Sequence, residues 1–222
     1  DILNNEKSLK NVIRKELDKI KKEFGRERRT VVEDGKEAVY VAAPVKEETV
    51  YFVMDRFGYS KTMDKATYQR NKENILKEYK FIVPCMNTDK ICLFTNKGQM
   101  HTVKVMDLPL TRLRDKGVPI DNVSNYSSSD EQIVSVYDSE QMRFAMLLFS
   151  TAQGMVKKVS GSEFQVAKRT ILATKLQEED SLVDVRVVNE NKHVVLQTKN
   201  GYFLRFPATE VPIKKKAAVG VR

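Results

Sequence analysis

Apolar residues at helical spacing mark the beginning of the chain. They recur every three or four positions, with lysines and arginines between them, at Leu9, Val12, Ile13, Leu17, Ile20 and Phe24. Gly25 follows at the position of a helix stop, so the pattern predicts one amphipathic α-helix over roughly residues 5–24. Behind it, residues 31–48 predict a linker that contains short strands at Val31-Val32 and at residues 39–42.

From residue 49 onward, the apolar positions repeat around four glycines, Gly58, Gly98, Gly154 and Gly201. Apolar residues stand seven and five positions before each glycine and ten positions after it. These residues are Tyr51, Val53 and Tyr68; Ile91, Leu93 and Leu108; Leu147, Phe149 and Phe164; and Val194, Leu196 and Val211. A strand, a tight turn whose glycine adopts positive φ, and a return strand predict a β-hairpin at each glycine.

A further apolar segment precedes each of the last three glycines, at residues 81–83, 133–136 and 182–185. We expect each segment to open its own repeat, so that the repeats form blades of about four strands. The glycines are 40, 56 and 47 residues apart, which is typical of blade-like repeats. The predicted fold is therefore mainly β, a propeller-like array of four-stranded blades over residues 49–222, preceded by one N-terminal α-helix. The last repeat stops soon after its hairpin, so we expect three to four blades of a longer array.

The composition narrows the class of protein. The chain has 222 residues, of which 41% are hydrophobic, and a net charge of +9. It lacks an apolar run near the ~20 residues that cross a membrane and lacks a signal peptide, which predicts a cytosolic protein. Two histidines and the absence of a Gly-x-x-x-x-Gly-Lys run disfavour metal hydrolases and P-loop enzymes. Cys85 and Cys92 lack metal-site spacing and are expected to be buried thiols.

Basic residues recur at one place in the repeat. Fourteen positions after the four glycines stand Lys72, Arg112, Lys168 and Lys215, with the basic neighbours Arg70, Arg114, Lys116, Arg169, Lys214 and Lys216. A weaker set, three or four positions after the glycines, contains Lys61, His101, Lys157, Lys158 and Arg205. The same offset places residues on the same edge of each blade, so these side chains would line one continuous rim. Such a rim suits the phosphates of a bent DNA duplex, and the alternative is a set of solvated loops.

Several segments resemble a known family. The stretch from Leu9 to Thr30, which ends in Gly-Arg-Glu-Arg-Arg-Thr, resembles the end of the breakage-reunion domain of bacterial type IIA topoisomerase A subunits. The repeats resemble the C-terminal domain of the A subunits of gyrase and topoisomerase IV, which is a β-pinwheel. The segments that carry this likeness are residues 94–100, 114–120, 150–158, 198–206 and 220–222.

The resemblance implies a domain organisation and a function. Residues 1–30 would form the end of the coiled-coil helix of the breakage-reunion domain. Residues 31–48 would form a linker with short strands, and residues 49–222 would form a DNA-binding β-pinwheel. The expected partners are double-stranded DNA and, in the parent enzyme, the B subunit and a second copy of the A subunit, with no membrane. ATP and Mg²⁺ would act with the B subunit, so we expect no cofactor and no metal in this segment. The expected location is the bacterial cytoplasm, at the nucleoid.

Two departures from the family pattern bear on activity. Gyrase carries a Q-R-R-G-G-K-G heptad in its first blade, and here the matching place reads Gln69-Arg70-Asn71-Lys72-Glu73-Asn74, without either paired glycine. This loss favours a topoisomerase IV role, decatenation and relaxation, over the gyrase role of negative supercoiling. The nucleophilic tyrosine of the family follows an arginine, and no Arg-Tyr pair occurs in this sequence. We therefore expect no catalytic residue in the segment.

Other interpretations remain open at this point. A blade-repeat scaffold that binds proteins would use the basic edge only for solubility. An enzyme that acts alone is disfavoured because no set of acid, base and nucleophile is visible. The acidic runs Asp130-Glu131 and Glu178-Glu179-Asp180 are expected to be exposed turn charges, and Tyr59, Tyr68 and Tyr202 are expected mainly to pack.

Overall fold

The computed structural model describes residues 5–31 and 46–222, which belong to two compact units divided after residue 44. The predicted strands at Val32 and residues 39–42 lie outside the described residues. None of the described helices is long and apolar enough to cross a membrane.

The first unit contains the predicted amphipathic helix. Helix α1 spans Glu6–Phe24, and the side-chain oxygen of Asn5 accepts hydrogen bonds from the backbone N–H groups of Lys7 and Ser8. At the other end, the Gly25 N–H donates to the Lys21 carbonyl at 2.9 Å. No residue of α1 is buried, so its apolar stripe is uncovered within the described residues. The helix and both of its ends are confirmed.

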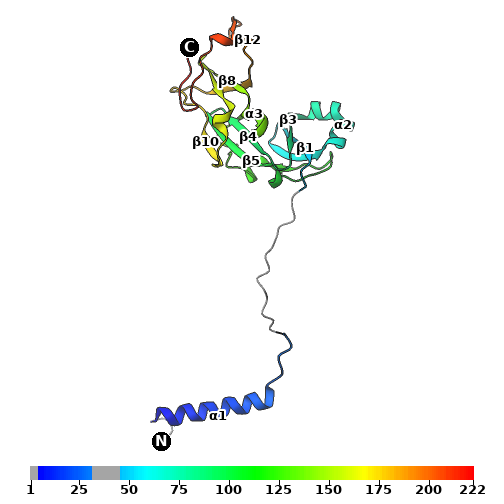
Figure 1. Ribbon diagram of the computed structural model, residues 1–222, viewed down its shortest axis with the longest axis vertical. Helices are drawn as coiled ribbons and strands as arrows, with labels where there is room; N and C mark the ends of the chain where they lie inside the picture. The colour runs from blue at the N-terminus through cyan, green and yellow to red at the C-terminus, as the bar shows by residue number, and fades with distance from the viewer. Residues whose placement is uncertain (1–4, 32–45) are drawn as a thin grey trace. The chain divides into compact units, whose positions relative to one another are not determined.

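The second unit is built from strands and a few short helices (Figure 1). The strands are β1 (Thr49–Asp55), β2 (Tyr59–Asp64), β3 (Tyr79–Met86), β4 (Lys90–Thr95), β5 (Gln99–Lys104), β6 (Val118–Pro119), β7 (Ile133–Asp138), β8 (Met146–Thr151), β9 (Val156–Ser160), β10 (Thr170–Leu172), β11 (Leu182–Val187), β12 (His193–Gln197) and β13 (Phe203–Pro207). The helices are α2 (Lys65–Glu78), α3 (Ser139–Arg143) and the 3₁₀ turns η1 (Val105–Asp107), η2 (Ile120–Asn122), η3 (Gly161–Phe164) and η4 (Ala208–Glu210).

All four predicted hairpins are confirmed. They are β1–β2, β4–β5, β8–β9 and β12–β13, and each turns at its glycine with φ between +73° and +86°. A polar side chain three positions before the glycine closes some of these turns. The Thr151 hydroxyl accepts from the Met155 N–H, and the Thr198 hydroxyl accepts from the Tyr202 N–H, both at 3.1 Å.

The strands that precede the hairpins join a different sheet from the one expected. The sheet orders are β3-β1-β2-β6, β10-β5-β4-β7, β11-β8-β9 and β12-β13. Strands β3, β7 and β11 were expected to open the second, third and fourth blades, but each pairs with the hairpin of the preceding repeat. The strands after the hairpins also reach back, because β6 pairs with β2 and β10 pairs with β5. Each complete sheet is therefore four-stranded, as predicted, but contains strands from two repeats.

The sheets pack face to face and use both of their faces. Phe52 of the first sheet meets Leu93 of the second in one core cluster, and Phe94, on the opposite face of the second sheet, meets Phe149 of the third in the next. Leu148, on the far face of the third sheet, packs with Val194 of the last hairpin. Figure 1 shows α2 beside β1 and β3 at one end of this unit and β12 at the other. The alternation of side chains along each strand thus serves two cores.

The first repeat carries a helix where the later repeats carry a basic segment and an outer strand. That outer strand always joins the preceding sheet, and no sheet precedes the first one in the described residues. Instead, α2 covers the outer face of the first sheet, where Ile75 is fully buried with Val53 and Met63. Tyr68 stacks on Tyr51 with ring centroids 3.8 Å apart. The prediction that Tyr68 packs is confirmed, whereas the same prediction for Tyr202 is wrong, because Tyr202 is 73% exposed.

Cys85 and Cys92 are buried free thiols, as predicted. Burial raises the pKa of both thiols to about 12.

Substitutions at two hairpin glycines distinguish the cost of backbone strain from the cost of a steric clash. Gly98 and Gly154 both have positive φ, but a Cβ on Gly98 would lie 2.6 Å from the Thr174 carbonyl oxygen, whereas nothing lies within 4 Å at Gly154. We expect Gly154→Ala to lower the free energy of unfolding in urea by about 1 kcal/mol, the cost of left-handed backbone. Gly98→Ala should lower it at least about twice as much. Equal losses would show that the Gly98 turn moves away from Thr174 without cost.

Candidate nucleic-acid interface

The sheets of the second unit have an inner and an outer edge. Strands β3, β7 and β11 each form one edge of their sheet, and β7 contacts both β3 and β11. The opposite edge is formed by β6, by β10, and in the third sheet by Ile213 and Val221, which bridge to β9. The segments just before and within these outer pieces carry most of the predicted basic residues.

We call this set the basic edge. Its eight members come from the second, third and fourth repeats: Arg112, Arg114, Lys116, Lys168, Arg169, Lys214, Lys215 and Lys216. Lys214 and Lys216 are half-buried, and the other six are exposed. Lys116 places its Nζ 4.1 Å from the centre of the Tyr59 ring. In the described part of the chain, the one basic-edge side chain in an ion pair with a carboxylate is Lys215, 3.4 Å from Glu163.

The remaining predicted residues lie elsewhere. Arg70 and Lys72 are exposed on helix α2, and Arg205 is exposed on β13. Lys157 and Lys158 are buried on β9, at 1% and 5% exposure. Burial removes these two lysines from the surface, so neither contacts a ligand at the basic edge in this conformation.

Lys61 and Lys157 use their ammonium groups inside the protein. Lys61 Nζ donates to the carbonyl oxygens of Arg112, Leu113 and Asp115, at 3.1, 2.8 and 2.5 Å. Lys157 Nζ donates to the carbonyl oxygens of Lys215, Lys216 and Ala218, at 3.3, 2.7 and 2.7 Å. We call each arrangement, one buried lysine and its three carbonyl acceptors, a lysine clamp.

The two clamps are copies of one another. Each lysine stands three positions after its hairpin glycine, on the second strand of the hairpin. Its three acceptors stand 14, 15 and 17 positions after the next hairpin glycine, residues 112, 113 and 115 after Gly98 and residues 215, 216 and 218 after Gly201. The acceptors belong to two equivalent ten-residue segments, 108–117 and 211–220, which we call the clamped loops.

A glycine closes each clamped loop against the preceding sheet. A Cβ on Gly117 would lie 2.4 Å from the Ser60 carbonyl oxygen, and a Cβ on Gly220 would lie 2.8 Å from the Val156 carbonyl oxygen. A side chain at either position would push the loop away from the strand that carries the lysine. The backbone of both loops therefore approaches the neighbouring sheet as closely as glycine allows.

The middle repeat replaces the clamp with a histidine. His101 is 2% exposed, and its Nε2 lies 2.8 Å from Glu131 Oε1 while its Nδ1 lies 3.0 Å from the Thr170 hydroxyl. Only residues 165–169 separate η3 from β10, so no ten-residue loop is present there to be clamped. The prediction that Glu131 is an exposed turn charge is wrong, because its carboxylate is the buried partner of His101. Asp130, Glu178 and Glu179 are exposed, as predicted, but Asp180 is half-buried and accepts a hydrogen bond from the Gln153 N–H at 3.0 Å.

In each clamp, burial lowers the pKa of the lysine, and nearby carboxylates partly offset this effect. Burial lowers the pKa of Lys157 to about 8, against the opposing effect of the Glu163 carboxylate. Burial also lowers the pKa of Lys61, against Glu78 and Asp115. Burial raises the pKa of Glu163, but hydrogen bonds from the Lys216 backbone N–H, at 2.9 Å, and from the Lys215 side chain together lower it below its usual range. Each clamped loop is thus tied to the preceding sheet through polar side chains.

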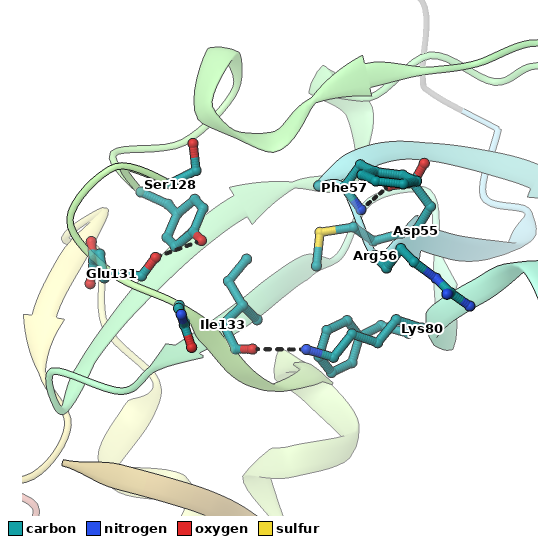
Figure 2. A pocket seen from close by; sticks show the side chains of 12 residues that line it. Asp55, Arg56, Phe57, Lys80, Ser128, Glu131 and Ile133 are labelled. Carbon is teal, nitrogen blue, oxygen red and sulfur yellow. Dashed lines mark hydrogen bonds between the residues drawn. The ribbon is translucent and has the colours of Figure 1, made fainter.

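A cavity of about 310 Å³ opens beside the first hairpin (Figure 2). Arg56 and Phe57 of the hairpin turn line it, and Lys80 donates to the Ile133 carbonyl at 3.4 Å. No nucleophile paired with a base lies among the residues that line this cavity. In the described residues, no group of three His, Cys, Asp or Glu side chains could hold a metal ion.

Comparison with known proteins finds similarity to gyrase and topoisomerase A subunits. A family model described as "DNA gyrase C-terminal domain, beta-propeller" matches residues 89–137, 145–189 and 192–222. The A subunit of DNA gyrase from Lawsonia intracellularis is 30% identical over 238 residues, and the A subunit of DNA topoisomerase 4 from Bacillus subtilis is 30% identical over 235 residues. Both alignments cover 100% of this chain and 28% of the relative, so the chain spans little more than a quarter of their length.

Solved structures show the same fold. A crystal structure of the C-terminal domain of DNA topoisomerase IV has a TM-score of 0.71 at 27% identity, over 80% of this chain and 57% of that one. A structure of the DNA gyrase A C-terminal domain has a TM-score of 0.52 at 16% identity, over 78% of this chain and 59% of that one, and supports the fold alone. The predicted β-pinwheel fold is confirmed.

The buried pair of His101 and Glu131 is open to a direct test. Glu131→Ala removes the acceptor of a buried ring N–H and should lower the free energy of unfolding in urea by about 3 kcal/mol. Asp130→Ala, the exposed neighbour, should change it by less than about 0.5 kcal/mol. Similar effects of the two substitutions would contradict the structural role of Glu131.

Proposed function

The chain belongs to the DNA gyrase C-terminal domain family, the domain of gyrase and topoisomerase IV A subunits, and from this we propose that its basic edge binds double-stranded DNA without sequence specificity. The observation that supports the proposal best is the basic edge itself. Eight cations from three successive repeats lie along the same edge of adjoining sheets, and six of them are exposed. Lysine and arginine at such positions neutralise phosphates and release counterions, which gives affinity regardless of base sequence.

The form of the basic edge favours contacts to phosphates over base reading. Its side chains project from short loops and edge strands, and the described part of the second unit offers no exposed recognition helix among them. Phosphate contacts fix the position of a protein on the duplex but carry no sequence information directly. Because successive sheets pack face to face, their outer edges follow one another, and a duplex that bends along them would gain contacts from each repeat.

We propose a topoisomerase IV role, in decatenation and relaxation, with a gyrase role as the alternative. Residues 69–74, which stand where gyrase has its heptad, lie within helix α2, which is kinked at Asn71. A helix that packs on the first sheet offers no glycine-rich backbone for close approach to phosphates. In the parent enzyme, the partners would be a second copy of the A subunit and the B subunit, which would carry the sites for ATP and Mg²⁺. The enzyme would act in the bacterial cytoplasm at the nucleoid.

A protein-binding scaffold is the competing function, and salt dependence distinguishes the two. We expect the chain to bind a 40-base-pair duplex, followed by fluorescence anisotropy, with log affinity falling against log salt at a slope of about −5 to −7 for six to eight phosphate contacts. Replacing Arg112, Arg114 and Lys116 by alanine should reduce the slope by about 3, equally for unrelated sequences.

The matched control removes the same charge elsewhere. Lys97, Lys104 and Lys192 are exposed and lie outside the basic edge, so their triple alanine variant should retain most of the affinity. A scaffold would show no binding at low salt, and a diffuse charge effect would weaken both triple variants equally.

Chiral wrapping separates the gyrase role from the topoisomerase IV role. A nicked circular plasmid is saturated with the chain, sealed with ligase and freed of protein. A domain that only bends DNA leaves the linking number close to that of the protein-free control, and this is the result we expect. A progressive shift of the topoisomers to one handedness would favour the gyrase role instead.

A further inference from the structure

We propose that Lys61 and Lys157 are positioning residues for DNA binding, each holding the clamped loop of the following repeat in the conformation that directs its cations outward. This inference rests on the proposed function, because it concerns how the basic edge is shaped. Neither lysine would touch DNA, since both are buried and their ammonium groups are occupied by protein carbonyls.

The match between donors and acceptors is complete in each clamp. An ammonium group has three N–H donors and no acceptor, and each clamp supplies three carbonyl oxygens. Hydrogen bonds from a charged donor are about twice as strong as neutral ones. With the carbonyls of Arg112 and Leu113 turned toward the ammonium group, the side chains of Arg112, Arg114 and Lys116 are exposed.

The clamp acts on the part of the loop that the sheet does not hold. In loop 108–117, backbone bonds to Thr62 fix the beginning, through the Pro109 carbonyl and the Thr111 N–H, both at 3.0 Å. At the other end, the Ser60 hydroxyl donates to the Val118 carbonyl at 3.0 Å. Between these anchors, the described hydrogen bonds to the sheet are those of Lys61. Leu113 also packs against the cluster that contains Val53 and Met63, and Lys116 lies over the Tyr59 ring.

Loop 211–220 is held in the same way. The Lys158 N–H donates to the Pro212 carbonyl at 2.9 Å, and the Lys214 N–H donates to the Lys158 carbonyl at 2.8 Å. Val221 exchanges two backbone bonds with Val156 at the other end, at 2.7 and 2.8 Å. Lys157 and Glu163 hold the middle, which contains Lys215 and Lys216.

Burying a lysine beneath a basic loop costs free energy, so its presence there needs an explanation other than packing. Three lysines and arginines already project from each loop, and a fourth positive charge behind them adds repulsion and loses hydration. A neutral apolar residue would avoid both costs but would leave two of the three carbonyls in each clamp without their donor. The third carbonyl, of Arg112 or Lys215, also accepts from the backbone N–H of Asp115 or Ala218. The lysine is therefore the residue that satisfies this loop conformation, and its charge adds to the positive potential that DNA would meet.

The experiment uses the two clamps as controls for each other. Lys61→Met and Lys157→Met are compared with Lys104→Met, which removes an exposed lysine of β5, by amide hydrogen exchange and mass spectrometry. We expect Lys61→Met to speed exchange at least about tenfold in peptides that cover residues 108–117 and to leave residues 211–220 unchanged. Lys157→Met should do the reverse, and Lys104→Met should affect neither loop.

Binding to the same 40-base-pair duplex then tests whether ordering of the clamped loop affects the affinity for DNA. We expect Lys157→Met to weaken binding about as much as alanine at Lys214, Lys215 and Lys216 together, and the combined variant to be no weaker than either. Lys104→Met should retain nearly wild-type affinity. Additive losses would indicate that Lys157 contacts DNA independently, and an unchanged affinity with a mobile loop would overturn the proposal. If the wild-type chain does not bind DNA, the proposed function fails, and loop exchange alone decides whether the clamps order the loops.

If a methionine variant does not fold, two glycine substitutions that change no charge test the proposal instead. Gly117→Ala places a Cβ 2.4 Å from the Ser60 carbonyl oxygen and displaces the clamped loop while every lysine is kept. Gly154→Ala introduces the same strain, since both glycines have φ +80°, but meets nothing within 4 Å. Gly117→Ala should speed exchange in residues 108–117 and weaken DNA binding, and Gly154→Ala should do neither. Equal DNA affinity in the two variants would overturn the proposal.

Discussion

A β-hairpin leaves two edges and two faces open, and closing them is the constraint on which the rest of this structure depends. A hairpin of two strands of five to seven residues is marginally stable by itself. Here each of the first three hairpins gains an inner strand and outer pairing from the repeat that follows it. Both edges of the hairpin are therefore covered by residues of the next repeat. Its faces are then covered by neighbouring sheets, and in the first repeat by α2. Stability is therefore shared between repeats, because no sheet is complete without its neighbour.

This exchange of strands also decides where the charge lies. The segment after each of the last three hairpins crosses to the outer edge of the preceding sheet and pairs there, and that segment carries the basic residues. The sheets meet one another at β3, β7 and β11. Positive charge thus accumulates on the opposite edge. The clamped loops are a direct result, since the lysine of one repeat and the carbonyls of the next come together only because the chain reaches back. The fold and the candidate DNA surface follow from the same connection.

The features that depend only on local residue spacing were predicted correctly from the sequence. Helix α1, the four glycine turns and the strands around them follow from periodicity and from the need for positive φ, and all are observed. Pairing between repeats could not be predicted, because a strand such as β3 has the same apolar pattern whichever hairpin it joins. Helix α2 was missed for a related reason, since its role depends on the absence of a preceding sheet and not on its own periodicity. The edge that carries Arg112, Lys168 and Lys215 was anticipated from their common offset, but Lys72, at the same offset, lies on α2 instead.

The buried polar residues show the limit of reading charge from a repeat. Lys61, His101 and Lys157 share one offset and suggested a second row of surface cations, yet all three are buried. Whether a lysine in a strand meets solvent depends on what crosses that strand, and here the next repeat crosses it. Glu131 was misread for the same reason, because its partner His101 is 30 residues away. A recurrent charge in an array of repeats therefore has two physical meanings, a surface for a partner or a fastening between repeats, and burial distinguishes them.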